Sequence, residues 1–175
     1  MARVFLIGFM GVGKTTLGRR VAEVLGYDFV DLDQAIEDHA GRSVSDLFTE
    51  EGEVGFRTRE TEQLDRLLLR NNVVIATGGG TPTLRGAMES MKESGIVIWL
   101  RASVATILSR TADCTDRPLL EGLDPVERGR KVETMMNLRE PIYSRADFTI
   151  DTDSQDPGLL ADAIYSRLQR HEELT

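Results

Sequence analysis

The sequence predicts an α/β protein, a three-layer sandwich with a central five-stranded parallel sheet. Two of the expected strands, 73–76 and 96–100, are apolar throughout, which is typical of strands covered by helices on both faces. Segments with helical periodicity separate the strands, and such βαβ crossovers join parallel strands. The other three strands are expected at 3–7, 28–31 and 147–150.

Capping signals predict where several helices begin. The run Asp124-Pro125-Val126-Glu127 combines an N-cap, a first-turn proline and a capping-box acid. Ser103 is expected to cap one helix, Ser43 or Ser45 another, and Asp156-Pro157 opens the last. These starts fall between the expected strands, as the alternating pattern requires.

Length and composition suit one soluble globular domain of 175 residues, with 41% hydrophobic residues. No apolar run approaches the ~20 residues that cross a bilayer, and the first strand follows Met1 too closely for a signal peptide. The single cysteine, Cys114, forms no internal disulfide, so a reducing cytoplasm is the expected location. The net charge of −8 argues against nucleic acid or an anionic membrane as the main partner.

The run Gly8-Phe9-Met10-Gly11-Val12-Gly13-Lys14-Thr15 fits the phosphate-binding pattern G-x-x-x-x-G-K-[ST], between a strand and a helix. Glycines let the backbone wrap an anion with its N–H groups pointing inward, and the helix that follows adds its positive dipole end. Lys14 would reach the outer phosphates, and the Thr15 hydroxyl would reach Mg²⁺. The sequence therefore predicts ATP and Mg²⁺ as cofactors, at a nucleotide site built from Gly11, Val12, Gly13, Lys14, Thr15 and Thr16.

Two acidic residues end the second strand, at the sheet edge where the phosphate loop opens. If the extended conformation continues that far, the carboxylates of Asp31 and Asp33 share a face. One could hold Mg²⁺ and the other accept a proton from a hydroxyl. The third strand ends in Thr77-Gly78-Gly79-Gly80 without an aspartate, so Asp31 is the metal candidate. The glycines would let a ligand approach the backbone closely, and a plain flexible turn is the alternative.

Two segments depart from the simple alternation. Residues 33–70 form a long, mostly helical insertion, and 111–123 is a polar stretch of the length typical of lids. Arg57 and Glu60, three residues apart in the insertion, are most simply interpreted as an exposed salt bridge on a helix. Arg117 in the expected lid could neutralise charge on a transferring phosphate.

Several other residues have an ordinary structural interpretation. Arg139 is expected to end a helix just before Pro141, and Arg110 to end the helix before it, each facing the negative end of a helix dipole. Trp99 and Met135-Met136 are expected in the core.

Taken together, these motifs resemble those of the shikimate kinases, and the resemblance covers nearly the whole chain. The family transfers the γ-phosphate of ATP to the 3-hydroxyl of shikimate, on the route through chorismate to the aromatic amino acids. The resemblance implies a P-loop NTPase fold of the nucleoside-monophosphate-kinase kind, in one kinase domain, 1–175, with 33–70 as the substrate-binding insertion and 111–123 as the lid. The motifs that carry it are Gly8–Thr15, Asp31-Leu32-Asp33, Gly41-Arg42-Ser43 with Phe48, Gly52-Glu53, Phe56-Arg57 with Glu60, Gly78-Gly79-Gly80, Arg117-Pro118-Leu119-Leu120 and Leu138-Arg139-Glu140-Pro141-Ile142-Tyr143.

The resemblance also implies a role for each candidate residue in catalysis and nucleotide binding. Asp33 would hydrogen-bond the attacking hydroxyl and act as the base. Lys14 and Arg117 would neutralise phosphate charge, with Mg²⁺ at Thr15 and Asp31 behind it. Arg110 would stack on adenine, beside a loop that contains Gln155 and Pro157.

For the acceptor, the resemblance implies a pocket for a small hydroxylated carboxylic acid. Arg forks grip carboxylates in two places, which suits such a substrate. Besides Asp33, the pocket would contain Arg57 and Arg139, the backbone at Gly79 and Gly80, Glu60 to orient Arg57, and Phe48 and Phe56 as walls.

Two other functions remain open from the sequence. One is another small-metabolite P-loop kinase, of the gluconate or nucleoside-monophosphate type, against which the Asp-Leu-Asp, Phe-Arg-x-x-Glu and triple-glycine motifs argue. The other is a nucleotide-dependent switch, but the guanine-reading Asn-Lys-x-Asp is absent. The resemblance implies shikimate as the partner of a monomeric protein, and the net charge argues against nucleic acid or a membrane.

Overall fold

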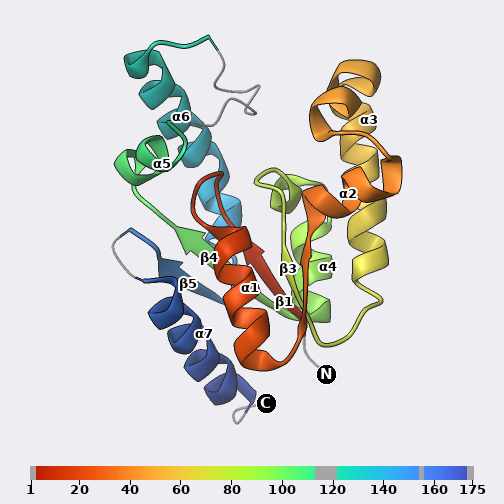
Figure 1. Ribbon diagram of the computed structural model, residues 1–175, viewed down its shortest axis with the longest axis vertical. Helices are drawn as coiled ribbons and strands as arrows, with labels where there is room; N and C mark the ends of the chain where they lie inside the picture. The colour runs from red at the N-terminus through yellow and green to blue at the C-terminus, as the bar shows by residue number, and fades with distance from the viewer. Residues whose placement is uncertain (1–2, 113–121, 154–155, 173–175) are drawn as a thin grey trace.

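The structure is a computed structural model that describes residues 3–112, 122–153 and 156–172 (Figure 1). Its strands form one parallel sheet in the order β2-β3-β1-β4-β5, which confirms the predicted sheet. The first strand is central, so its carboxyl end meets those of its neighbours along one edge. The strands are β1 (Arg3–Ile7), β2 (Asp28–Asp31), β3 (Val73–Ala76), β4 (Ile96–Arg101) and β5 (Phe148–Asp151).

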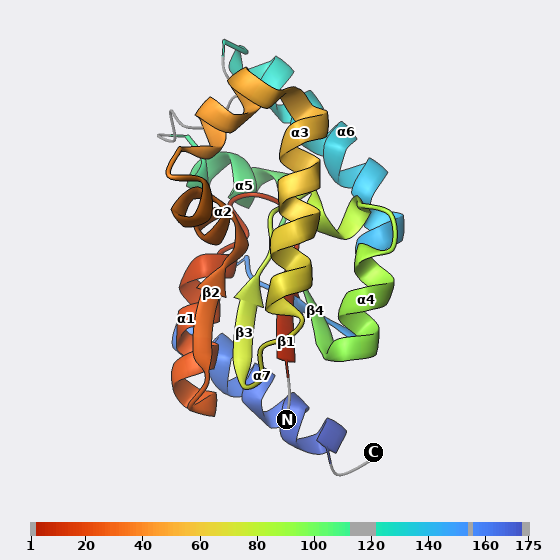
Figure 2. The same ribbon diagram turned by 90° about the vertical axis from the view of Figure 1, so that its right-hand side faces the viewer.

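Helices cover both faces of the sheet, so the predicted three layers are confirmed (Figures 1 and 2). Successive side chains of a strand point to opposite faces. Accordingly, Leu6 packs with apolar residues of α1 and α7, whereas Phe5 and Ile7 pack with those of α3 and α4. The helices are α1 (Lys14–Leu25), α2 (Leu32–Ala40), α3 (Val44–Leu67), α4 (Ala87–Ser94), α5 (Val104–Arg110), α6 (Pro125–Tyr143) and α7 (Pro157–Glu172), with a short 3₁₀ helix, η1 (Thr81–Thr83).

The predicted helix starts are largely confirmed. Ser103 caps α5, and Asp124 caps α6 with the reciprocal Glu127 bond of a capping box. Of the two serines considered for α3, Ser43 is the cap, because its hydroxyl accepts from the Asp46 backbone N–H. None of the helices within the described ranges is long and apolar enough to cross a membrane.

The insertion between β2 and β3 consists of α2 and α3, which pack against each other. Gly52 interrupts α3 with φ 68° and ψ −177°, a conformation that glycine adopts without strain. The part of α3 before Gly52 is therefore bent away from the rest (Figure 2). The bend sets Phe48 and Phe56, on its two sides, ring against ring with centroids 4.4 Å apart.

Helix α6 does not end before Pro141, as the sequence suggested, but continues to Tyr143. An interior proline removes a backbone hydrogen bond and costs about 3 kcal/mol. The continuation buries the Tyr143 ring beside Trp99, with centroids 5.9 Å apart, and apolar burial of that kind offsets the loss. Arg139 consequently lies inside the helix rather than at its end.

Candidate active site

The phosphate-binding loop joins the central strand to α1 at the carboxyl edge of the sheet. Gly8, Gly11 and Gly13 have φ of 141°, 75° and 95°, values that favour glycine. The turn is tight, since a Cβ on Gly8 would lie 2.3 Å from the Leu100 carbonyl oxygen. The Lys14 ammonium donates to the carbonyls of Gly8 and Phe9, each over 2.9 Å, which brings it across the start of the loop.

Asp31 and Asp33 do not share an extended face, so that expectation is wrong. Asp31 is the N-cap of α2, and its Oδ1 accepts from the Asp33 backbone N–H over 3.1 Å. Asp33 is therefore already helical, and the two carboxylates face different groups. The Thr15 hydroxyl donates to Asp31 Oδ2 over 2.6 Å, whereas Asp33 Oδ1 lies 2.8 Å from where a Cβ on Gly78 would be.

Residues 78–80, called here the glycine segment, are packed so closely against the side chains expected to bind the acceptor that a Cβ would have little room. A Cβ on Gly78 would lie 2.8 Å from Glu60 Oε1, one on Gly79 would lie 3.2 Å from Arg139 Nη1, and one on Gly80 would lie 2.6 Å from Arg57 Nη1. None of the three has a positive φ. A plain flexible turn therefore does not explain the triplet, and close packing of charged side chains does.

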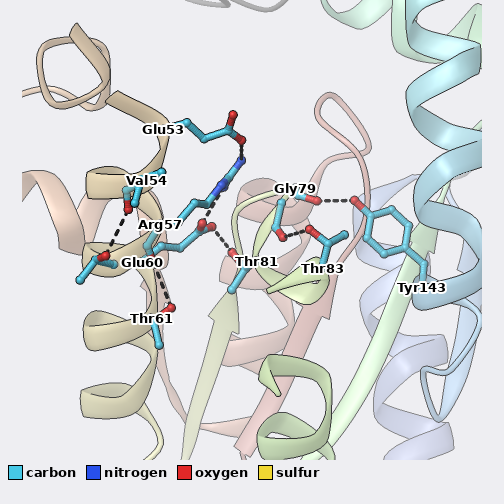
Figure 3. Close-up of polar contacts among 11 residues, drawn as sticks. Glu53, Val54, Arg57, Glu60, Thr61, Gly79, Thr81, Thr83 and Tyr143 are labelled. Carbon is cyan, nitrogen blue, oxygen red and sulfur yellow. Dashed lines mark hydrogen bonds and ion pairs between the residues drawn. The ribbon is translucent and has the colours of Figure 1, made fainter. Parts of the chain in front are cut away.

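Arg57 pairs with a buried Glu60, so the fully exposed salt bridge suggested by the sequence is wrong (Figure 3). Arg57 Nη1 lies 2.6 Å from Glu60 Oε2, and the buried Thr81 hydroxyl donates to the other oxygen of Glu60. Burial lowers the pKa of Arg57, but hydrogen bonds and charges from Glu60 and Glu53 raise it by more. Arg57 is thus held as a cation, 5.7 Å from the Phe56 ring centroid.

Two further arginines reach the phosphate-binding loop. Arg139 on α6 lies with its guanidinium carbon 5.3 Å from the Phe9 ring centroid. Arg110, the last residue of α5, donates to the Thr152 carbonyl over 2.6 Å and to the Gly11 carbonyl over 3.4 Å. Neither acts mainly on its own helix end, which was their simplest interpretation.

Sequence reasoning missed Thr152 and Tyr143. The buried Thr152 hydroxyl donates to the Val12 carbonyl over 3.1 Å, and the Tyr143 hydroxyl donates to the Gly79 carbonyl over 2.5 Å. Thr152 could have been found, since it is the first polar residue after β5 at the ligand-binding edge. Arg117 and Gln155, and most of the expected lid at 111–123, lie outside the described residues.

A cleft of about 1240 Å³ opens along this edge of the sheet. Of the expected acceptor residues, Asp33 and Gly79 line the cleft, and Arg139 and Arg57 adjoin it through the glycine segment. The expected nucleotide and metal residues that line it are Gly11, Val12, Gly13, Lys14, Thr15, Thr16, Asp31, Arg110 and Pro157.

The part of the chain that the structure describes contains no cluster of three or more His, Cys, Asp or Glu placed to hold a metal. Thr15 and Asp31 do offer two oxygens within hydrogen-bond distance of each other. Such a small oxygen set suits Mg²⁺, which keeps several waters and is completed by substrate phosphates.

A parallel sheet with a Gly-Lys-Thr loop after its central strand, and with acidic and guanidinium groups facing that loop, defines a small-molecule kinase of the P-loop class. The family model described as shikimate kinase matches residues 10–169. The chain belongs to the shikimate kinase family.

Known shikimate kinases are similar to this chain over nearly its full length. The shikimate kinase of Chlorobium chlorochromatii is 38% identical, over 96% of this chain and 91% of its own. That of Thermodesulfovibrio yellowstonii is 40% identical, over 97% and 96%. The structure of shikimate kinase from Acinetobacter baumannii in complex with shikimate has a TM-score of 0.92 and 39% identity, over 98% of this chain and 94% of that one. A gluconokinase from Sinorhizobium meliloti, at 18% identity and a TM-score of 0.58, shares the fold alone.

Proposed function

We infer that this protein transfers the γ-phosphate of ATP to the 3-hydroxyl of shikimate, yielding shikimate 3-phosphate and ADP. The observation that carries this inference is the glycine segment, against which Asp33, Arg57 and Arg139 all press beside the phosphate-binding loop. A γ-phosphate on the loop and an acid gripped by the arginines would then meet at Asp33. Phosphoryl transfer needs such positioning and charge neutralisation more than covalent chemistry.

On the nucleotide side, the loop amides of residues 11–16 and the Lys14 ammonium would hold the phosphates. Mg²⁺ would bind at Thr15, with Asp31 behind it, and would neutralise charge on the phosphate oxygens. Arg110 and Pro157, together with Gln155, would contact the adenine, and Arg117 would add a cation over the transferring group.

On the acceptor side, Asp33 would take the proton of the attacking hydroxyl. Asp33 lies in the first turn of α2 and lines the cleft, where a carboxylate oxygen can accept the proton. Arg57 and Arg139 would bind the carboxylate of shikimate, and Glu60 would fix Arg57. The ring would lie between Phe48, Phe56 and the backbone of Gly79 and Gly80.

We propose that 1–175 acts as one kinase domain and as a monomer in the cytoplasm, with 33–70 binding the acceptor and 111–123 serving as the lid. Size-exclusion chromatography with light scattering measures the molar mass in solution, which should be that of a monomer. For the lid, an ATP analogue together with shikimate should change the rate at which a protease cleaves within 111–123.

The deciding experiment is ADP release from Mg-ATP with shikimate, gluconate, nucleoside monophosphates or water as acceptor. Shikimate is expected to give the highest rate, with the product identified as the 3-phosphate by NMR. The Lys14→Met variant should lose phosphoryl transfer while its circular dichroism spectrum stays that of the wild type. Faster turnover with gluconate or a nucleoside monophosphate would contradict the inference.

A further inference from the structure

Tyr143, the last residue of α6, directs its hydroxyl at the glycine segment (Figure 3). The hydroxyl donates to the Gly79 carbonyl over 2.5 Å, and the whole residue is only 2% exposed. A buried tyrosine needs a partner for its hydroxyl. Here that partner is not a neighbouring turn of α6 but the backbone of a residue that lines the cleft.

Arg139 approaches the same glycine from the preceding turn of α6. Residues four apart lie on one face of a helix, so Arg139 and Tyr143 point in the same direction from α6. Burial raises the pKa of Tyr143 above its ordinary value, and the charge of Arg139 and its hydrogen bond offset that rise only in part. The hydroxyl therefore keeps its proton at neutral pH and remains a donor to Gly79.

Gly79 and Arg139 both belong to the acceptor side of the cleft. Arg139 Nη1 would be 3.2 Å from a Cβ on Gly79, so the guanidinium and the backbone at Gly79 are already in close approach. The next carbonyl is held in a similar way, because the Thr83 hydroxyl donates to the Gly80 carbonyl over 2.6 Å. The glycine segment has no side chains of its own, and these hydroxyls fix the direction of its backbone.

We propose that Tyr143 is a positioning residue for the acceptor, acting through Arg139 and Gly79. Its hydroxyl sets the guanidinium of Arg139 and the backbone of Gly79 at one fixed separation, which preorganises the group that grips the carboxylate. This assignment rests on the proposed function, since it takes the acceptor to be shikimate. It predicts an effect on acceptor binding and little effect on ATP.

The Tyr143→Phe variant removes one oxygen and keeps the ring beside Trp99. We expect the KM for shikimate to rise about tenfold, the usual effect of losing one hydrogen bond in a charged network. The KM for ATP and kcat should each stay within about twofold, because the hydrogen bond that is lost is made to Gly79 and not to the phosphate-binding loop. Tyr165→Phe is the matched control, since Tyr165 is 38% exposed on α7, and it should leave both KM values unchanged.

A binding measurement separates positioning from a general loss of structure. Trp99 is the only tryptophan of the chain and its ring centroid lies 5.9 Å from that of Tyr143, so its fluorescence can follow shikimate binding without ATP. The dissociation constant should rise about tenfold in Tyr143→Phe, by loss of the same hydrogen bond. With Arg139→Lys added, the combined loss should be smaller than the product of the two single losses, because the residues act on one site.

An unchanged shikimate KM and dissociation constant in Tyr143→Phe would overturn the proposal. So would equal weakening of ATP and shikimate together with a lower melting temperature, because that pattern marks a purely structural tyrosine. A wild-type protein that fails to phosphorylate shikimate would contradict the proposed function instead, so the two failures are distinguishable.

Discussion

Glu60 Oε2 lies 2.6 Å from Arg57 Nη1, and the two side chains differ sharply in exposure, at 1% for Glu60 and 27% for Arg57. The acid is thus a buried support and the guanidinium is the part that faces outward. The other carboxylate oxygen of Glu60 accepts a hydrogen bond from the Thr81 hydroxyl, so both oxygens have a partner. This arrangement aims a cation without leaving a buried charge unpaired.

Replacing Glu60 by Gln should remove the buried charge while keeping the shape of the side chain. Breaking a buried ion pair costs about 3–5 kcal/mol, and the partial exposure of Arg57 reduces the expected loss of unfolding free energy to about 1–3 kcal/mol. Urea unfolding measures it, and the KM for shikimate should rise as well. Glu53→Gln, at a side chain 72% exposed, is the control and should change stability by less than about 0.5 kcal/mol.

Gly80→Ala should displace Arg57 without unfolding the protein. The new Cβ would lie 2.6 Å from Arg57 Nη1, which is the far end of a flexible side chain and can move. We expect the KM for shikimate to rise by about tenfold or more, the effect of losing a charge-assisted hydrogen bond, with little change in melting temperature.

Gly129→Ala is a matched glycine substitution with the opposite expectation. Gly129 lies inside α6, and a Cβ there would meet Leu108 Cδ1 of α5 at 3.6 Å, an ordinary van der Waals distance. Helix propensity should then stabilise the protein by about 0.5–1 kcal/mol, with unchanged kinetics. If both glycine variants altered the shikimate KM alike, the contact at Gly80 would not be the cause.

Asp31→Asn should separate the two roles of Asp31. Asparagine caps helices about as well as aspartate, so the melting temperature should change little. Loss of the negative charge beside Thr15 should raise the Mg²⁺ concentration for half-maximal activity by about tenfold or more. A titration of activity against Mg²⁺ at fixed ATP measures this, and an unchanged Mg²⁺ requirement would remove Asp31 from the metal site.

Asp33→Asn should slow turnover by about 10²–10⁴, the range for loss of a general base. The KM for ATP should be unchanged, because Asp33 faces the glycine segment rather than the phosphate-binding loop. Steady-state kinetics measure both constants. Asp65→Asn, at an exposed position on α3, is the control, and wild-type turnover in Asp33→Asn would exclude the base assignment.

Asp151 should make a small, pH-dependent contribution to the free energy of unfolding. The Arg101 hydrogen bond and charge lower the pKa of Asp151, so its contribution is present above the unfolded-state pKa of about 3.9 and is lost as pH falls through the folded value. Because the pair is well exposed, it should contribute at most about 0.5 kcal/mol. Asp151→Asn should therefore lower the unfolding free energy at pH 7 and approach the wild type below about pH 4. A difference that stays constant with pH would contradict this.

Local signals in the sequence were enough to predict several parts of the fold and of the site. The phosphate-binding loop and the N-caps at Ser103 and Asp124 depend on residues within one or two turns of each other. Local signals gave wrong predictions at positions whose surroundings are set by tertiary contacts. Helical spacing predicted that Arg57 and Glu60 are neighbours, but it did not predict that Glu60 is buried. Pro141 suggested a helix end, but α6 continues past it to Tyr143, whose burial stabilises the last turn.

The sequence by itself therefore determined the alternation of strands and helices, the nucleotide loop and the family, since each is written in short runs of residues. Only the tertiary structure decided the strand order, the separate surroundings of Asp31 and Asp33, and the convergence of Arg57, Arg139 and Tyr143 on the glycine segment. The physical reason is that these contacts join residues from α3 and α6 to the end of β3, up to 64 positions apart, and that close packing rather than local propensity brings them together.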